Sequence, residues 1–343
     1  MTSYHGAPGV GGWNPQVPTT QVPTTQVPTP PVPVSTLPTR PVRYPAFWRT
    51  DAWSPWKPIV ALLIAGVVFF ILQVMAFVVA MTIDVATGRI DLNGYLERIR
   101  LGKVEITPTF FLANNVALGL SIPLAFLLSR WPFGQPGGFV SSVIGRLRWR
   151  LLLTYMAAIS LPWLVVMALS LWSGRGALHI NADTWVLAVG ILLTTPFQAA
   201  GEEYLFRGIG YRAFASFFRN PAIAIPFGGV LQALLFMSAH GAGDATLNAH
   251  YLLFGLIAAW LVWRTGGLEA AIAVHVVNNL TSEAAMPFTD ISQMFDRQEG
   301  VASLADVWPI AVCLLIAVVL AEVFVRRSKP RVLGPMSAGA SSA

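Results

Sequence analysis

The feature that most constrains this chain is a series of apolar segments, each long enough to cross a bilayer. About 20 residues of α-helix span the hydrocarbon core of a membrane. Only 11% of the 343 residues are charged, against roughly a quarter in soluble domains. The sequence therefore predicts an all-α, polytopic membrane helix bundle with about eight transmembrane helices. The predicted spans cover residues 58–83, 108–128, 151–172, 184–206, 222–240, 248–263, 268–287 and 307–325.

The distribution of Lys and Arg predicts the orientation of these spans, because cytoplasmic loops retain more of these residues. With the N-terminus inside, 16 of the 22 Lys and Arg residues fall on the inner side. We therefore expect an integral protein of a bacterial plasma membrane with both termini cytoplasmic. The net charge of +6 then lies at the membrane surface, and it gives no reason to expect a nucleic acid partner.

The first 57 residues differ in composition from the spans that follow. They contain the repeat QVPTTQVPTTQVPTPPVPV and no acidic residue before Asp51, so they lack the means to bury an apolar core. We expect a disordered Pro/Thr-rich cytoplasmic tail that ends in an aromatic and cationic anchor around Trp48, Trp53 and Trp56. The expected domains are this tail at 1–57, a transmembrane domain at 58–327 and a short C-terminal tail at 328–343.

A polar stretch interrupts the fourth predicted span. The sequence QAAGEEYLFRGIGYR at 198–212 places two glutamates and an arginine directly after an apolar run. The apolar period continues through Phe218, which predicts one helix of about 35 residues, kinked near Pro196. A carboxylate inside a membrane costs about 3 kcal/mol, so charges at such a position indicate a functional site.

The spacing within EEYLFR assigns different partners to the two glutamates. Glu203 and Arg207 are four residues apart, the separation at which Glu and Arg pair on a helix surface. Glu202 is turned about 100° away from Glu203 and lacks that partner. We therefore expect Glu203 and Arg207 to be structural and Glu202 to act as a base.

Two histidines lie on polar stripes inside predicted spans, each with a partner four residues away. His240 follows Phe236 in FMSAH, and His275 precedes Asn279 in HVVNN. A single histidine in a membrane is more often a hydrogen-bonded contact between helices than a catalyst. Two such histidines, together with the paired glutamates, favour a catalytic site.

A helical hairpin brings the base and the first histidine to one level. Glu202 lies 18 residues before Asn220, and His240 lies 20 residues after it. At about 1.5 Å per residue, the two side chains differ in height by only a few Å. The sequence therefore predicts an acid and an imidazole at the same depth.

These three motifs, in this order, resemble those of the CPBP intramembrane proteases, the family that includes Rce1-type CAAX prenyl proteases (CAAX prenyl protease 2) and bacterial Abi proteins. The family pattern is EExxxR, then FxxxH, then HxxxN or HxxxD, and every position matches. The resemblance covers about residues 150–290. The matching residues are Glu202, Glu203, Arg207, Phe236, His240, His275 and Asn279.

The resemblance implies an endopeptidase that cleaves a peptide bond near or within the membrane. Glu202 with His240 would activate a water molecule, and His275 with Asn279 would stabilise the oxyanion. The paired glutamate and arginine would hold the helix in place. The implied substrate is a membrane-associated peptide or protein, lipidated or amphipathic, in contact with the lipid bilayer.

The resemblance also implies a metalloprotease, because Glu202, His240 and His275 form a set that could bind Zn²⁺ with an open position. The HExxH motif that fixes zinc in soluble proteases is absent from the sequence. A metal-free mechanism, in which glutamate activates the water, is an equal alternative at this stage.

Two other classes of function stay open. A non-catalytic membrane immunity or partner-binding protein would keep this fold and tolerate loss of Glu202 or His240. A proton-coupled transporter would also place Glu, His and Arg inside the membrane, but it predicts internal repeats, and no clear repeat relates the two halves of the chain.

Overall fold

The computed structural model describes residues 35–100, 106–291 and 298–335, together with a few isolated positions among the first 11 residues. The chain divides into two units, Met1–Pro33 and Val34–Ala343. The Pro/Thr repeat predicted to be disordered lies outside the described residues.

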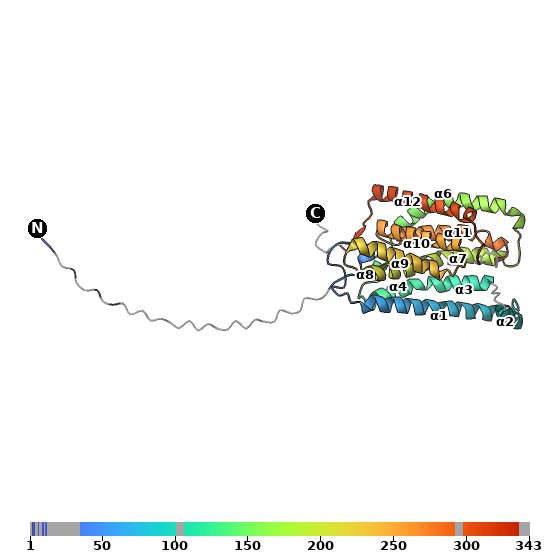
Figure 1. Cartoon of the computed structure of the whole chain (residues 1–343), viewed down its shortest axis with the longest axis horizontal. Coiled ribbons are helices and arrows are strands. Elements are labelled where there is room, and N and C mark those ends of the chain that lie inside the picture. Colours follow the sequence, from blue (N-terminus) through green and yellow to red (C-terminus); the bar gives the residue numbers. More distant parts are fainter. Residues whose placement is uncertain are drawn as a thin grey trace. The chain divides into compact units, whose positions relative to one another are not determined.

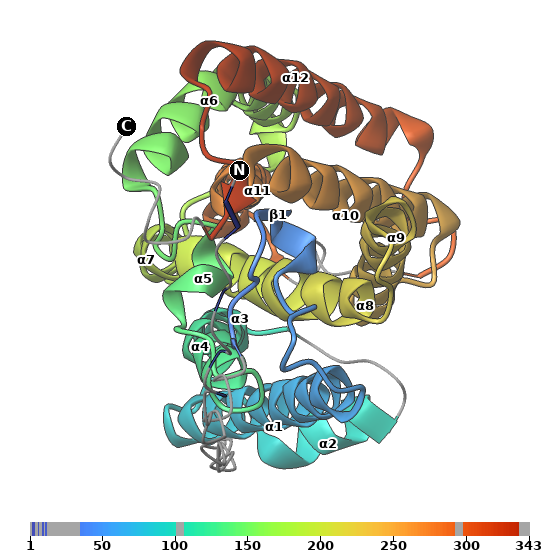
Figure 2. The ribbon, with the colours of Figure 1, turned by 90° about the vertical axis from the view of Figure 1, so that its left-hand side faces the viewer.

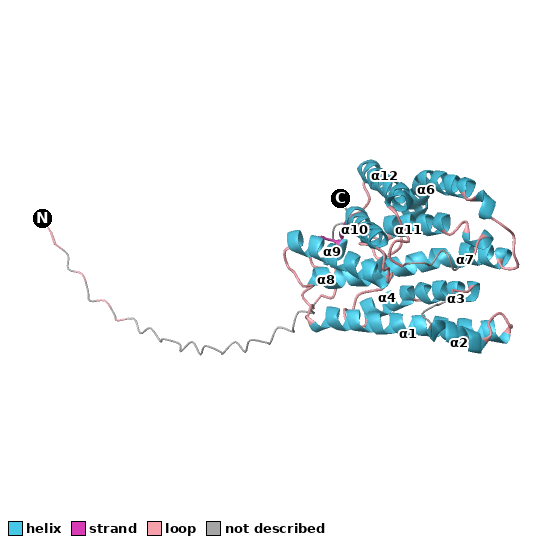
Figure 3. Cartoon of the chain, turned by 45° about the vertical axis from the view of Figure 1, so that its right-hand side comes forward, coloured by secondary structure: helices cyan, strands magenta, loops and turns pink. Residues whose placement is uncertain are grey.

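The second unit is a bundle of long helices that run side by side (Figure 1). Helix makes up most of its described part, as Figure 3 shows. Seven helices among the described residues are long and apolar enough to cross a membrane, which confirms the predicted polytopic helical class. These spans are α1 (Trp56–Ala86), α3 with α4 (Pro108–Gly119, Ser121–Arg130), α6 (Trp149–Ser173), α7 with η3 and α8 (Thr184–Glu203, Tyr204–Tyr211, Arg212–Ser216), α9 (Pro221–Ala239), α10 (Ala245–Thr265) and α12 (Leu304–Ser328).

Short elements connect these spans. The remaining described helices and strands are β1 (Val42–Arg43), η1 (Tyr44–Ala46), α2 (Leu92–Arg100), α5 (Gly138–Ser141), η2 (Arg175–Ala177), α11 (Glu269–Ser282), η4 (Met286–Phe288) and β2 (Leu333–Gly334). Thr107 accepts a hydrogen bond from the backbone N–H of Phe110 and so caps α3, where a cap stabilises a helix by about 1 kcal/mol.

The eighth predicted span, residues 268–287, is a different kind of helix. α11 has 14 residues, which is too short to cross a bilayer, and every residue of Glu269–Val277 is buried. It lies between α6, α7 and α10 (Figure 2). Its apolar composition therefore reflects enclosure by other helices, which sequence hydropathy does not distinguish from enclosure by lipid.

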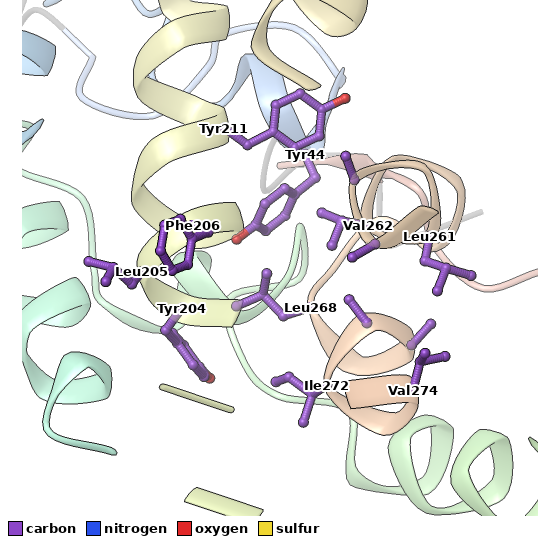
Figure 4. Packing of buried hydrophobic residues seen from close by; sticks show 14 of the residues in the cluster. Tyr44, Tyr204, Leu205, Phe206, Tyr211, Leu261, Val262, Leu268, Ile272 and Val274 are labelled. Atoms are coloured by element: carbon purple, nitrogen blue, oxygen red, sulfur yellow. The ribbon is translucent and has the colours of Figure 1, made fainter. Parts of the chain in front are cut away.

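The fourth span is one helix of 33 residues from Thr184 to Ser216, close to the predicted length. Its irregularity is a π-helical segment, η3, that begins after Glu203, and all eight residues of η3 are buried. Figure 4 shows side chains of η3, among them Tyr204 and Phe206, in the same apolar cluster as Leu268 and Ile272 beside α11. A π-helical turn inside an α-helix often marks a functional site, because it re-aims the side chains on either side of it.

Glycines allow α7 to pack closely against α3. A Cβ atom built on Gly201 would lie 2.1 Å from the backbone oxygen of Leu118, and one built on Gly190 would lie 2.5 Å from Leu112. Because a backbone oxygen cannot rotate away, a side chain at residue 201 would push the two helices apart. This close contact sets the position of the glutamates that follow residue 201.

The segment before α1 is part of the bundle. β1 pairs in antiparallel fashion with β2, so the two ends of the second unit are joined. Trp48, expected at the membrane interface, is fully buried and stacks on Phe133 with ring centroids 3.9 Å apart. Residues 35–57 therefore fold with the transmembrane domain, and the boundary that composition placed at residue 57 lies at Val34.

Candidate active site

The predicted pair on α7 is present in the bundle interior. Arg207 Nη1 donates a hydrogen bond to Glu203 Oε1 at 3.0 Å, and both side chains are fully buried. The guanidinium carbon of Arg207 lies 4.4 Å from the centre of the Phe236 ring, within the range of a cation–π contact. The first and second motifs thus meet at Arg207.

His275 lies between the two glutamates. Its Nδ1 is 2.8 Å from Glu203 Oε1, and its Nε2 is 3.5 Å from Glu202 Oε2. An ionised carboxylate only accepts hydrogen bonds, so Nδ1 is the donor to Glu203. The neutral imidazole then presents a bare Nε2 toward Glu202. Glu203 therefore orients His275 as well as pairing with Arg207.

Three pairs of polar side chains connect α7 with α11, at successive helical repeats on both helices. We refer to them as the α7–α11 ladder. The pairs are Glu203 with His275 at 2.8 Å, Gln198 with Asn279 at 2.9 Å and Thr195 with Glu283 at 2.7 Å. Gln198 also donates from Nε2 to Glu202 Oε1 at 2.6 Å, so the middle pair is linked to the candidate base.

His240 caps the C-terminus of α9. Its Nδ1 is 2.8 Å from the carbonyl oxygen of Phe236, and its ring stacks on Tyr251 with centroids 3.9 Å apart. A carbonyl only accepts, so Nδ1 donates there and Nε2 is the proton acceptor of the neutral ring. α9 has 19 residues, which is about 28 Å of helix. It is therefore much shorter than the fourth span, which has 33 residues.

A cavity of about 540 Å³ lies between α1, α3, α7, α10, α11 and α12. Among the described residues, its lining includes Glu202, His240 and Asn279 but not His275. The volume lies within the range of about 300–1,000 Å³ that is usual for ligand pockets. Three of the four predicted catalytic residues therefore line one cavity. The fourth, His275, lies outside the lining and contacts Glu202.

The described site does not have the geometry of a metal centre. No group of three or more His, Cys, Asp and Glu side chains in the described ranges is arranged to hold a metal ion. In the expected set of Glu202, His240 and His275, each histidine donates from Nδ1, as metal-binding histidines commonly do, but His275 lies outside the cavity lining. As placed, these three side chains do not converge on one point as a zinc site requires, so the chemistry is derived from the side chains alone.

Helical spacing could have revealed the ladder residues that the motif search missed. Thr195, Gln198 and Glu202 follow one another at i, i+3 and i+7 on α7. Glu283 extends the stripe of His275 and Asn279 by another four residues. An acid or amide repeated on one stripe of an apolar helix is the signal that identifies such partners.

The fold and this interior site define a polytopic helical membrane protein with a carboxylate and imidazole centre. Residues 183–281 match the family model of the Rce1-like type II CAAX prenyl endopeptidases. This region extends from the residue before α7 nearly to the end of α11, and it contains all seven motif residues. The match confirms the resemblance drawn from the three motifs.

One curated protein is similar to this chain over a segment about as long as the one that the family model matches. Over 98 residues, the chain is 31% identical to the uncharacterized protein YyaK of Bacillus subtilis (strain 168). The aligned segment covers 28% of this chain and 32% of that protein, so the chain spans about a third of the length of this relative. No solved structure matches the chain.

Proposed function

We propose that this protein is a membrane-embedded endopeptidase that hydrolyses a peptide bond near or within the bilayer, with Glu202 as the general base. The observation that carries the proposal is the state of this side chain. It is 7% exposed, it lines the cavity, and its Oε2 has no hydrogen-bond partner among the described residues. A buried carboxylate oxygen without a donor is costly, and a water molecule in the cavity beside Glu202 would offset this cost and could lose a proton to the carboxylate.

The roles of the surrounding residues follow from their donors and acceptors. Glu202 would take a proton from the attacking water and later deliver it to the leaving amine. His240 would accept a second hydrogen bond from the same water through Nε2. Asn279 has a second N–H beyond the one given to Gln198, and this donor would stabilise the oxyanion on the scissile carbonyl.

His275 would act through Glu202. Its Nε2, held in place by the hydrogen bond from Nδ1 to Glu203, lies 3.5 Å from Glu202 Oε2. At this distance the imidazole would influence the proton affinity of Glu202, and it would exchange a proton with it only after the two side chains close to hydrogen-bond distance. The Glu203–Arg207 pair fixes that imidazole at the required orientation, and no metal ion is assigned to this mechanism.

The proposed substrate is a membrane-associated peptide or protein. The name of the matching family model refers to CAAX prenyl endopeptidases, so prenylated peptides form one class to test, and unmodified amphipathic peptides form another. The pairing of β1 with β2 holds the two ends of the second unit together, and Lys and Arg are frequent in the segments near both ends, which supports a cytoplasmic position for both at a bacterial plasma membrane.

The proposal is tested by peptide hydrolysis in proteoliposomes, with wild type and Glu202→Gln at equal amounts. The substitution keeps the size of the side chain and removes the base, so kcat should fall by a factor of about 10² to 10⁴. Glu322→Gln is the matched control, because Glu322 of α12 pairs with Arg264 of α10 and Arg326 of α12, away from the cavity. Equal cleavage by wild type and Glu202→Gln would reject the proposal.

A further inference from the structure

The third pair of the α7–α11 ladder holds a carboxylate that the proposed reaction does not use. Glu283 accepts a hydrogen bond at Oε2 from Thr195 Oγ1 at 2.7 Å. Thr195 in turn accepts from Asn115 Nδ2 at 3.1 Å. Glu283 is thereby held by residues of two other helices, and it lines the same cavity as Glu202.

The position of Glu283 along α11 relates it to the reacting centre. It lies eight residues beyond His275, which is about 12 Å along a helix axis. An extended peptide advances about 3.3 Å per residue, so three to four residues of a bound substrate would cover this distance. Glu283 is therefore within reach of a side chain close to the scissile bond.

The charge of the described cavity lining is one-sided. It includes the carboxylates of Glu202, Glu283 and Asp306 and contains no Lys or Arg. Asp306 is engaged by the backbone N–H and hydroxyl of Ser303 in the cap of α12. No ion pair between described residues involves Glu283.

A second observation points to a ligand in this cavity. Glu202 lines the cavity and is more than nine-tenths buried, and its Oε2 has no hydrogen-bond donor among the described residues. Glu202 is thus an acceptor without a donor at the reacting centre, and Glu283, about two helical turns further along α11 than His275, is a carboxylate without a cationic partner among the described residues. In a low-dielectric space lined by one sign of charge, a group of opposite sign is attracted strongly.

We propose that Glu283 is a specificity-determining residue that binds a cationic side chain, Lys or Arg, of the substrate within about four residues of the scissile bond. This inference rests on the proposed endopeptidase function and deepens it by naming the charge of the substrate segment. The same carboxylates disfavour entry of a substrate's terminal carboxylate. The structure thus favours cleavage within a basic segment over recognition of an acidic chain end.

The test uses peptides with both termini blocked, in which one Lys is moved through four positions on each side of the cleavage site and compared with Gln. Wild type in proteoliposomes should cleave the best Lys peptide with a kcat/KM about tenfold or more above that of its Gln counterpart. Glu283→Gln, which keeps the hydrogen bond from Thr195, should lose this preference and still cleave the Gln peptide. Glu283→Lys should instead prefer the peptide with Glu at that position.

The controls separate this inference from the proposed function. Glu322→Gln removes an equal charge away from the cavity and should keep the Lys preference. A wild type that cleaves in a Glu202-dependent way without any Lys preference would overturn the inference and leave the function standing. An equal loss on Lys and Gln peptides in Glu283→Gln, or a preference only for a free N-terminal ammonium, would also overturn it. Absence of Glu202-dependent cleavage on every peptide would overturn both.

Discussion

The buried pair of Glu203 and Arg207 yields a prediction that separates stability from chemistry. The two charges are 3.0 Å apart and both side chains are fully buried. At an effective dielectric constant of about 20, their attraction is about 5.5 kcal/mol. Arg207→Met leaves the Glu203 carboxylate buried with His275 as its one remaining donor among the described residues, and removal of one partner from a buried pair costs about 3–5 kcal/mol.

The double substitution distinguishes this account from simple loss of packing. Glu203→Gln with Arg207→Met removes both charges, so the double variant should be more stable than the sum of the single losses by about 2 kcal/mol or more. Its activity should stay low, because the Nδ1 proton of His275 has lost its carboxylate acceptor. Stability is measured as the free energy of unfolding in mixed micelles, followed by tryptophan fluorescence. Additive single losses, or recovery of activity together with stability in the double variant, would refute the reasoning.

Two further predictions follow from the packing and the chemistry of the site. Gly201→Ala should lower both stability and peptide cleavage, because its Cβ would meet the backbone oxygen of Leu118 at 2.1 Å. The control is Gly66→Ala in α1, whose Cβ would meet nothing within 4 Å and which should be neutral. Equal behaviour of the two variants would contradict the packing argument. A strong zinc chelator should leave peptide cleavage unchanged, because the described site brings no three ligands together. If the chelator abolished cleavage and added Zn²⁺ restored it, the assignment of the base to Glu202 alone would be contradicted.

The sequence predicted those features that depend on local periodicity. Hydropathy located the spans to within a few residues, and the four-residue spacing of Glu203 and Arg207 placed them in contact, as observed. The spacing from the turn at Asn220 also brought Glu202 and His240 to one cavity. These predictions succeeded because each follows from the geometry of a single helix or of one hairpin.

Features that depend on contacts between distant segments could not be predicted in this way. Hydropathy measures only how apolar a segment is, so α11 looked like a span although protein encloses it. The burial of Trp48 depends on Phe133, which is 85 residues away in the sequence. The hydrogen bond between Glu203 and His275 depends likewise on how α7 and α11 pack against each other. The spacing of residues along one chain does not show which residues of the two helices lie side by side.

The central claim is that Glu202 makes this protein a protease, and the most direct measurement is made in cells. Wild type and Glu202→Gln are expressed at equal levels, with insertion into the membrane verified for both, and the termini of membrane peptides are compared by mass spectrometry. We predict new termini that are present with wild type and absent with Glu202→Gln. An identical set of termini in the two strains under several growth conditions would contradict the claim and favour a non-catalytic or transport function for the same fold.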